Sequence, residues 1–274
     1  MSMKGAPNFL KKIINMLPWD RYQHQTDIPD NYTSSDVFLV SYPKSGNTFL
    51  RFLIANAIKV HFDKEVNVNW FTIQQIIPDI HISTAIRQQG PFGISSLPRI
   101  IKSHNSYNRY YKNVILLVRD PRDIMVSYFH YLRSQNRLPK QADLSQVVRD
   151  PNKGIKAWNE HTKSWLGKYR SGQNIRYYKF EDLVGNTANT LSQIMGLLGL
   201  KLSENEISEV VEICSKENMR DLEEGSRPSM AVENHDKNFV RKGKVEEGTE
   251  LSPSEKTLIE QEAEEMMKKV GYIE

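Results

Sequence analysis

The chain has 274 residues, of which 39% are apolar and 26% are charged, and its formal net charge is +4. This length allows one large domain or two small ones with a substantial core, and the small net charge excludes a polycation that binds nucleic acid by charge alone. The single cysteine, Cys214, excludes an intramolecular disulfide and a cysteine-based metal cluster, which favours a reducing compartment such as the cytoplasm.

The first thirty residues predict a short amphipathic helix. Five apolar residues recur there at helical spacing, namely Phe9, Leu10, Ile13, Ile14 and Leu17. No apolar run in the chain approaches the ~20 residues that a membrane-spanning helix needs, and this end lacks the apolar centre of a signal peptide. We expect residues 1–30 to form an extension that packs on the domain, with binding to a membrane surface as the alternative.

Residues 37–58 predict a strand, a tight turn and a helix. The apolar run Val37-Phe38-Leu39-Val40 is typical of a buried strand, and residues 49–58 are typical of a helix with most of its surface covered. The turn between them reads Ser41-Tyr42-Pro43-Lys44-Ser45-Gly46-Asn47-Thr48. Such a turn directs backbone N–H groups and the positive end of a helix dipole at one place, which suits an anion. Because Lys44 precedes the only glycine, the turn differs from G-x-x-x-x-G-K-[ST], and an ordinary surface connection is the alternative.

Two later strands end in polar residues. Residues 99–104 predict a strand on which Lys102 and His104 share a face, because side chains two residues apart point the same way. Residues 114–118 are all apolar and are followed directly by Arg119, whose charge at the end of a buried strand needs an anionic partner or solvent. Ligands of open α/β sheets bind beyond the carboxyl ends of the strands, so these residues are candidates for a binding site.

The remaining elements follow from capping residues and periodicity. Asp120 and Pro121 are typical of the N-cap and the first residue of a helix. A further strand is expected at residues 175–180. Helices are expected at 154–169, at 187–198, at 204–215 and within 244–274, starting near Ser252. The polar segments 135–150 and 227–238 are expected to be loops.

Four segments resemble, in the same order, motifs of the cytosolic-type sulfotransferases, which use 3′-phosphoadenosine 5′-phosphosulfate (PAPS). Residues 42–48 resemble the family's 5′-phosphosulfate loop, Y-P-K-S-G-T-[ST]-W. Residues 102–104 resemble its K-[ST]-H strand end, which carries the catalytic base. Residues 119–127 resemble its R-[ND]-P-R-D…S motif, which holds the 3′-phosphate, and residues 239–243 resemble the F-x-R-K-G loop that closes over that phosphate. The chain is therefore identified as a bacterial-like member of this family, over most of its length.

The resemblance implies a role for each matching residue. His104 would be the general base, with Lys44 and Lys102 as the other catalytic residues. The residues expected to bind PAPS are Lys44, Ser45, Gly46, Asn47, Thr48, Phe49, Arg119, Ser127, Phe180, Lys216, Arg241, Lys242 and Gly243. Three of these depart from the family pattern, since Phe49 replaces a tryptophan, Phe180 a tyrosine and Lys216 an aromatic residue, which predicts an altered adenine site. Lys216 could lie over the purine as a cation–π contact.

The expected fold is an α/β fold, with one domain over residues 1–274 and a central parallel sheet flanked by helices, as in the P-loop nucleotide hydrolases. The expected function is in-line transfer of the sulfuryl group from PAPS to a hydroxyl or amino group of a small-molecule acceptor. No metal is expected, because a sulfuryl group carries less charge than a terminal phosphoryl group. A small-molecule kinase, which would need ATP and Mg²⁺, and a non-catalytic nucleotide-binding module are the alternatives. The oligomeric state is left open.

Overall fold

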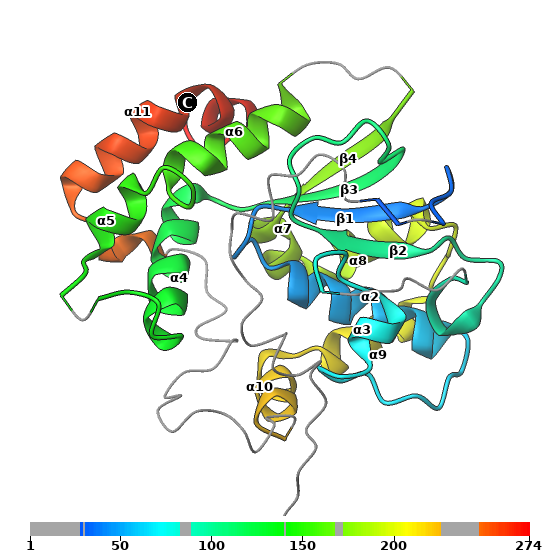
Figure 1. The fold of residues 1–274 in the computed structure, drawn as a ribbon. Coiled ribbons are helices and arrows are strands. Elements are labelled where there is room, and N and C mark those ends of the chain that lie inside the picture. The colour runs from blue at the N-terminus through cyan, green and yellow to red at the C-terminus, as the bar shows by residue number, and fades with distance from the viewer. Residues whose placement is uncertain (1–27, 30, 83–88, 140, 168–171, 226–246) are drawn as a thin grey trace, which may run out of the picture.

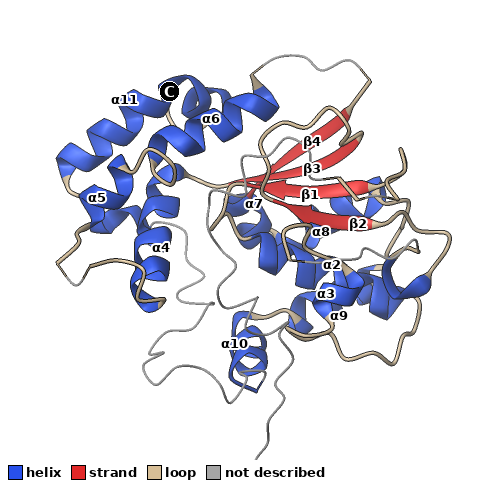
Figure 2. Cartoon of the chain, viewed as in Figure 1, coloured by secondary structure: helices blue, strands red, loops and turns tan. Residues whose placement is uncertain are grey.

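The computed structural model describes residues 28–29, 31–82, 89–139, 141–167, 172–225 and 247–274. Its centre is a sheet of four parallel strands in the order β2-β1-β3-β4, which Figure 2 shows in red. The strands are β1 (Val37–Ser41), β2 (Ile100–Ser103), β3 (Asn113–Val118) and β4 (Asn174–Lys179). The expected central parallel sheet is thereby confirmed. The predicted N-terminal helix lies outside the described residues.

The strand register brings the carboxyl ends of β1, β2 and β3 to one edge of the sheet. Val40 of β1 pairs with Ser103 of β2 on one side and with Leu116 of β3 on the other. The residues that directly follow these strands therefore meet at that edge. Two of the predicted site residues, His104 and Arg119, are among them.

One face of the sheet packs against α2 (Asn47–His61), α3 (Ile73–Ile76), α7 (Phe180–Gly185), α8 (Thr187–Leu197) and α9 (Glu204–Ile213). The strands contribute apolar side chains such as Leu39 and Ile115 to this core. Side chains alternate between the two faces of a strand, so the neighbouring residues serve the other face. The apolar run of β1 is accordingly buried on both sides, as its composition predicts.

The other face packs against α4 (Pro121–Ser134), α6 (Ile155–Leu166) and α11 (Pro253–Val270). Phe38 and Leu116 are among the strand residues of this second core. Figure 1 shows these helices together with α5 (Leu144–Arg149) on the opposite side of the sheet from α2, α3 and α9. The chain also forms α10 (Lys216–Gly225) and short 3-10 turns at Pro91–Gly93 and Glu247–Glu250. No helix in the described part of the chain is both long and apolar enough to cross a membrane.

The predicted helix ends agree with the structure where capping residues mark them. Asp120 accepts a hydrogen bond from the Arg122 N–H and Pro121 opens α4, as expected. Ser252 caps α11 in a capping box with Glu255.

The predicted loop at residues 135–150 is partly wrong, because α5 lies inside it. Asp143 accepts from the Gln146 N–H, and the Gln146 side chain accepts in return from the Asp143 N–H. This capping box starts a helix in a segment of polar composition, and burial of Val147 and Val148 holds it in place. The D-x-x-Q pattern was the available sequence signal.

Candidate active site

The turn between β1 and α2 presents uncapped backbone N–H groups. We call residues 42–48 the anion loop. Gly46 is the N-cap of α2 with φ +90°, and none of the described side chains caps this helix end. The N–H groups in the first turn of a helix have no partner within it, which leaves those of Asn47 and Thr48 directed out of the helix end. Ser45 Oγ is fully buried and has no hydrogen-bond partner among the described residues. An anion is the ligand that these donors suit.

Phe180 and Arg119 fix the backbone of the anion loop. A Cβ atom added to Gly46 would lie 2.3 Å from Phe180 Cδ2, so the aromatic ring lies directly against the glycine. The guanidinium carbon of Arg119 is 4.6 Å from the centroid of the same ring. Arg119 Nη1 also donates to the carbonyl oxygen of Lys44 at 3.2 Å, and its Nη2 is 3.6 Å from Asp123 Oδ2. Arg119 therefore contacts the loop backbone, and its charge lies beside the Asp123 carboxylate.

The Lys44 side chain lies over Tyr131, on the face of α4 that also carries Ser127. The Lys44 backbone has φ +69°, and its Nζ lies 4.3 Å from the centroid of the Tyr131 ring. Ser127 precedes Tyr131 by four residues and is half-buried. Residues four apart share a helix face, so the structure brings these two predicted site residues to the same side of α4.

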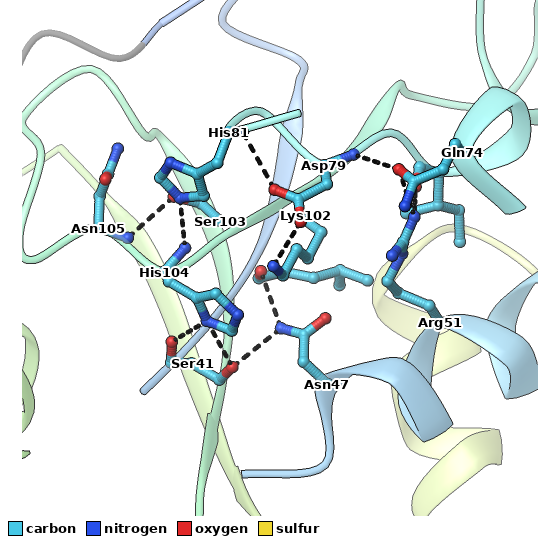
Figure 3. A network of polar contacts seen from close by, with 12 residues as sticks. Ser41, Asn47, Arg51, Gln74, Asp79, His81, Lys102, Ser103, His104 and Asn105 are labelled. Carbon is cyan, nitrogen blue, oxygen red and sulfur yellow. Dashed lines mark hydrogen bonds and ion pairs between the residues drawn. The ribbon is translucent and has the colours of Figure 1, made fainter. Parts of the chain in front are cut away.

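His104 lies next to the anion loop (Figure 3). Its Nδ1 is 2.7 Å from the carbonyl oxygen of Ser41, which can only accept, so Nδ1 carries the proton and Nε2 carries the lone pair. Asn47, the first residue of α2, donates to Ser41 Oγ at 3.1 Å and to the Leu39 carbonyl at 3.2 Å. The end of β1, the imidazole of His104 and the start of α2 are thereby joined by hydrogen bonds. Burial, with a smaller contribution from the Lys102 charge, lowers the pKa of His104 well below its ordinary value, which keeps the ring neutral near pH 7.

Lys102 points to the same side of β2 as His104, as the strand pattern predicts. Its Nζ lies 2.6 Å from Asp79 Oδ2, and both side chains are buried. Burial lowers the pKa of Lys102, and the Asp79 charge opposes that effect. Asp79 Oδ1 accepts from the His81 N–H at 3.0 Å, and His81 Nε2 accepts from the His104 N–H at 3.0 Å.

Sequence reasoning missed Asp79, His81, Gln74 and Arg51, all of which lie in this polar network (Figure 3). Arg51 Nη2 donates to Gln74 Oε1 at 3.2 Å and to the Ile77 carbonyl, and Gln74 Oε1 also accepts from the Asp79 N–H at 3.2 Å. The two contacts of Arg51 join residues 23 and 26 positions apart. The single local signal was a charged residue, Arg51, within the mostly apolar first part of α2.

The residues predicted to bind the adenine lie in different surroundings and do not form one cluster. Phe49 is half-buried and packs against the core beneath α2, and Phe180 is buried with its ring against Gly46. Lys216 is exposed at the start of α10. Arg241, Lys242 and Gly243 lie outside the described residues. In the part of the chain that the structure describes, no three histidine, cysteine or acidic side chains are grouped so that they could hold a metal ion.

Three imidazoles, of which His161 is buried and His81 and His104 are half-buried, predict that the protein loses stability in mild acid. Burial lowers the pKa values of His81 and His161 to about 4, and that of His104 in the same direction. Below pH ~6.5 these histidines bind protons in the unfolded chain but not in the folded chain. The free energy of unfolding therefore decreases by about 1.4 kcal/mol for each histidine when the pH is lowered by one unit. Urea unfolding between pH 7.5 and 5 measures this slope, which His161→Asn should lower by one proton. A free energy of unfolding that is independent of pH over this range would contradict the assignment of three neutral rings.

Comparisons with known proteins point to one family. The family model described as a sulfotransferase domain matches residues 34–270. Human sulfotransferase 2B1 is 28% identical over 196 residues, which cover 64% of this chain and 49% of the relative. Rat sulfotransferase 2A1 is 30% identical over 194 residues, which cover 68% of this chain and 67% of the relative. The chain thus spans between about half and two thirds of these two curated relatives.

Solved structures share the fold. Retinol dehydratase in complex with androsterone and the inactive cofactor PAP matches with a TM-score of 0.66 and 20% identity, over 95% of this chain and 85% of that chain. A mouse sulfotransferase complexed with PAP matches with a TM-score of 0.60 and 19% identity, over 94% and 88% of the two chains. At these identities the likeness supports the architecture alone.

Proposed function

The chain belongs to the sulfotransferase domain family, and from this we propose that it moves the sulfuryl group of PAPS to a hydroxyl or amino group of a small-molecule acceptor. The observation that carries the proposal is the junction at Ser41. There the imidazole of His104 and the first residue of α2 are bound to the same residue, at the mouth of the anion loop. A base and an anion site at this spacing suit transfer of an anionic group to a nucleophile.

The anion loop fits the 5′-phosphosulfate of PAPS. The buried hydroxyl of Ser45 and the N–H groups of Asn47 and Thr48 form a compact donor set around Gly46, whose lack of a side chain lets the Phe180 ring lie against the loop. Lys44 would offset the charge that develops on the bridging oxygen of the leaving nucleotide. Asn47 holds the loop to β1 through its side chain and would contribute its backbone N–H.

Arg119 and Ser127 would hold the 3′-phosphate of PAPS, as would Arg241, Lys242 and Gly243. Arg119 already contacts the loop backbone, and Ser127 shares its helix face with the side chain that Lys44 covers. A planar guanidinium is the preferred partner for a phosphate. The adenine would lie toward Phe49 and Lys216, while Phe180 would support it through the loop.

His104 would act as the general base toward the acceptor. A neutral imidazole whose Nδ1 proton is committed to the Ser41 carbonyl offers Nε2 as the proton acceptor. Lys102 would neutralise charge on the sulfuryl oxygens during transfer. The solved neighbours were complexed with androsterone and with retinol, so a small organic alcohol is the first acceptor class to test. The lone, buried Cys214 suits a reducing compartment such as the cytoplasm.

The test is an acceptor screen with ³⁵S-labelled PAPS in buffer containing EDTA. We expect label to move to at least one alcohol, phenol or amine, with one PAP released for each acceptor sulfonated. Parallel reactions with labelled ATP and Mg²⁺ test the phosphotransferase alternative. Transfer from ATP alone would overturn the proposal, and tight binding of PAPS without transfer to any acceptor would favour a nucleotide-binding module.

A further inference from the structure

The buried polar network beside β2 contains the carboxylate of Asp79 (Figure 3). This carboxylate contacts Lys102 directly and is joined to His104 through His81. We propose that Asp79 is a positioning residue, which holds Lys102 in its charged form beside His104 so that it can engage the sulfuryl group. The proposal rests on the proposed function, because it concerns how Lys102 meets PAPS.

Backbone pairing places Asp79 opposite Lys102. The segment around Asp79 runs parallel to β2, with the Lys102 N–H donating to the Pro78 carbonyl at 2.8 Å and the Ile80 N–H donating to the Lys102 carbonyl at 3.0 Å. The two side chains consequently meet with Nζ and Oδ2 2.6 Å apart. Their burial is nearly complete, with 10% and 4% of the side-chain surfaces exposed. A buried ammonium without a counterion would be strongly unfavourable, so the carboxylate stabilises the charge on Lys102.

Asp79 is itself held to the helix that begins at the anion loop. Its N–H donates to Gln74 Oε1 at 3.2 Å, and that oxygen also accepts from Arg51 of α2. Arg51 further donates to the carbonyls of Ile73, the first residue of α3, and Ile77, which directly follows that helix. A single set of contacts therefore runs from α2 through residues 73–79 to Lys102. This continuity couples the position of the lysine to that of the loop.

The same carboxylate reaches toward the base. Asp79 Oδ1 accepts from the His81 N–H, and His81 Nε2 accepts from the His104 N–H, each at 3.0 Å. The His81 and His104 rings lie nearly parallel with centroids 6.2 Å apart. Asp79 is thus connected to both Lys102 and His104 at the carboxyl end of β2.

The charges around Lys102 determine how removal of the Asp79 carboxylate should change the pKa of the lysine. In the part of the chain that the structure describes, the titratable groups that face Lys102 are Asp79, Arg51, His81 and His104, and of these Asp79 alone is negative. Burial and Arg51 lower the pKa of Lys102, whereas Asp79 raises it. Replacing Asp79 with a neutral residue leaves only the lowering effects, so Lys102 should lose its proton at a lower pH than in wild type.

The test compares the binding of PAPS and PAP to Asp79→Asn by calorimetry between pH 6 and 9. Lys102 is proposed to contact the sulfuryl group, which only PAPS carries. We expect the PAPS affinity of the variant to fall about tenfold relative to wild type at pH 9, to recover toward pH 6, and to leave PAP affinity unchanged. The wild-type ratio of PAPS to PAP affinity should stay constant over this range.

Asp36→Asn is the matched control. Asp36 forms a buried ion pair with Arg99 at the amino ends of β1 and β2, opposite the candidate site. Like Asp79→Asn, this substitution removes a buried carboxylate that pairs with a basic side chain on or next to β2, so it should cost similar stability, yet leave the pH dependence of PAPS binding as in wild type. A purely structural role of Asp79 would make the two variants alike.

Each outcome is decisive. A folded Asp79→Asn protein with wild-type PAPS affinity at every pH would overturn the proposal. If that variant does not fold, the ¹³Cε shift of Lys102 in the wild-type protein replaces it: a charged amine at pH 7 supports the proposal and a neutral amine overturns it. Failure of the wild-type protein to bind either PAPS or PAP would instead count against the proposed function.

Discussion

Replacing His104 with asparagine should reduce sulfuryl transfer by about 10³-fold or more while leaving PAP affinity within about threefold of wild type. An asparagine amide can still donate to the Ser41 carbonyl that Nδ1 now contacts at 2.7 Å, but it offers no basic nitrogen to the acceptor. The anion loop does not use the imidazole, so nucleotide binding should persist. The measurement is kcat with the best acceptor from the screen, beside calorimetric titration with PAP.

His61→Asn is the control for this loss. His61 is also an imidazole with a hydrogen-bonded partner, since its Nδ1 lies 2.8 Å from Glu206 Oε1, but it stands at the far end of α2. Its replacement should leave kcat unchanged. Retention of more than a tenth of the wild-type kcat in His104→Asn would remove His104 from the role of general base.

Gly46→Ala should abolish measurable PAP binding, which means a loss of at least about a hundredfold. The added Cβ would lie 2.3 Å from Phe180 Cδ2 and 2.4 Å from Cε2, at a backbone φ of +90° that disfavours side chains. Phe180 is buried against the loop and in contact with Arg119, so relief of the clash must displace either the ring or the loop backbone. Calorimetric titration with PAP measures the result.

Gly199→Ala separates the clash from the backbone strain. Gly199 has φ +79°, close to that of Gly46, but a Cβ there would meet nothing within 4 Å. It should lower stability by about 1 kcal/mol and leave PAP affinity at the wild-type value. Equal PAP affinity in Gly46→Ala and wild type would show that the loop does not hold the nucleotide.

Much of the fold and part of the site could be predicted because their signals are local. The apolar run before Ser41, the glycine turn and the covered helix together identify β1, the anion loop and α2. Asp120 with Pro121 marks the start of α4 in the same way. His104 and Arg119 could be placed at the site because both directly follow buried strands whose carboxyl ends share one edge.

The rest depends on contacts that no local pattern encodes. Asp79 follows Pro78 in a segment without regular structure, and its role emerges only because that segment pairs with β2. The burial of Phe180 against Gly46 likewise joins elements 134 residues apart. The Phe180 ring supports the loop backbone. The presence of phenylalanine where the family motif has tyrosine did not predict this role. The helix α5 was missed for a different reason, since polar composition outweighed its capping box.

The central claim is that the anion loop holds a 3′-phosphoadenosine nucleotide while the neighbouring imidazole stays neutral. Calorimetric titration of the wild-type protein with PAP in EDTA tests it most directly. We predict one PAP bound per chain, without any requirement for metal, and with an affinity in His104→Asn that is within about threefold of wild type. Absence of heat with PAP, together with binding of ATP only when Mg²⁺ is added, would contradict the account.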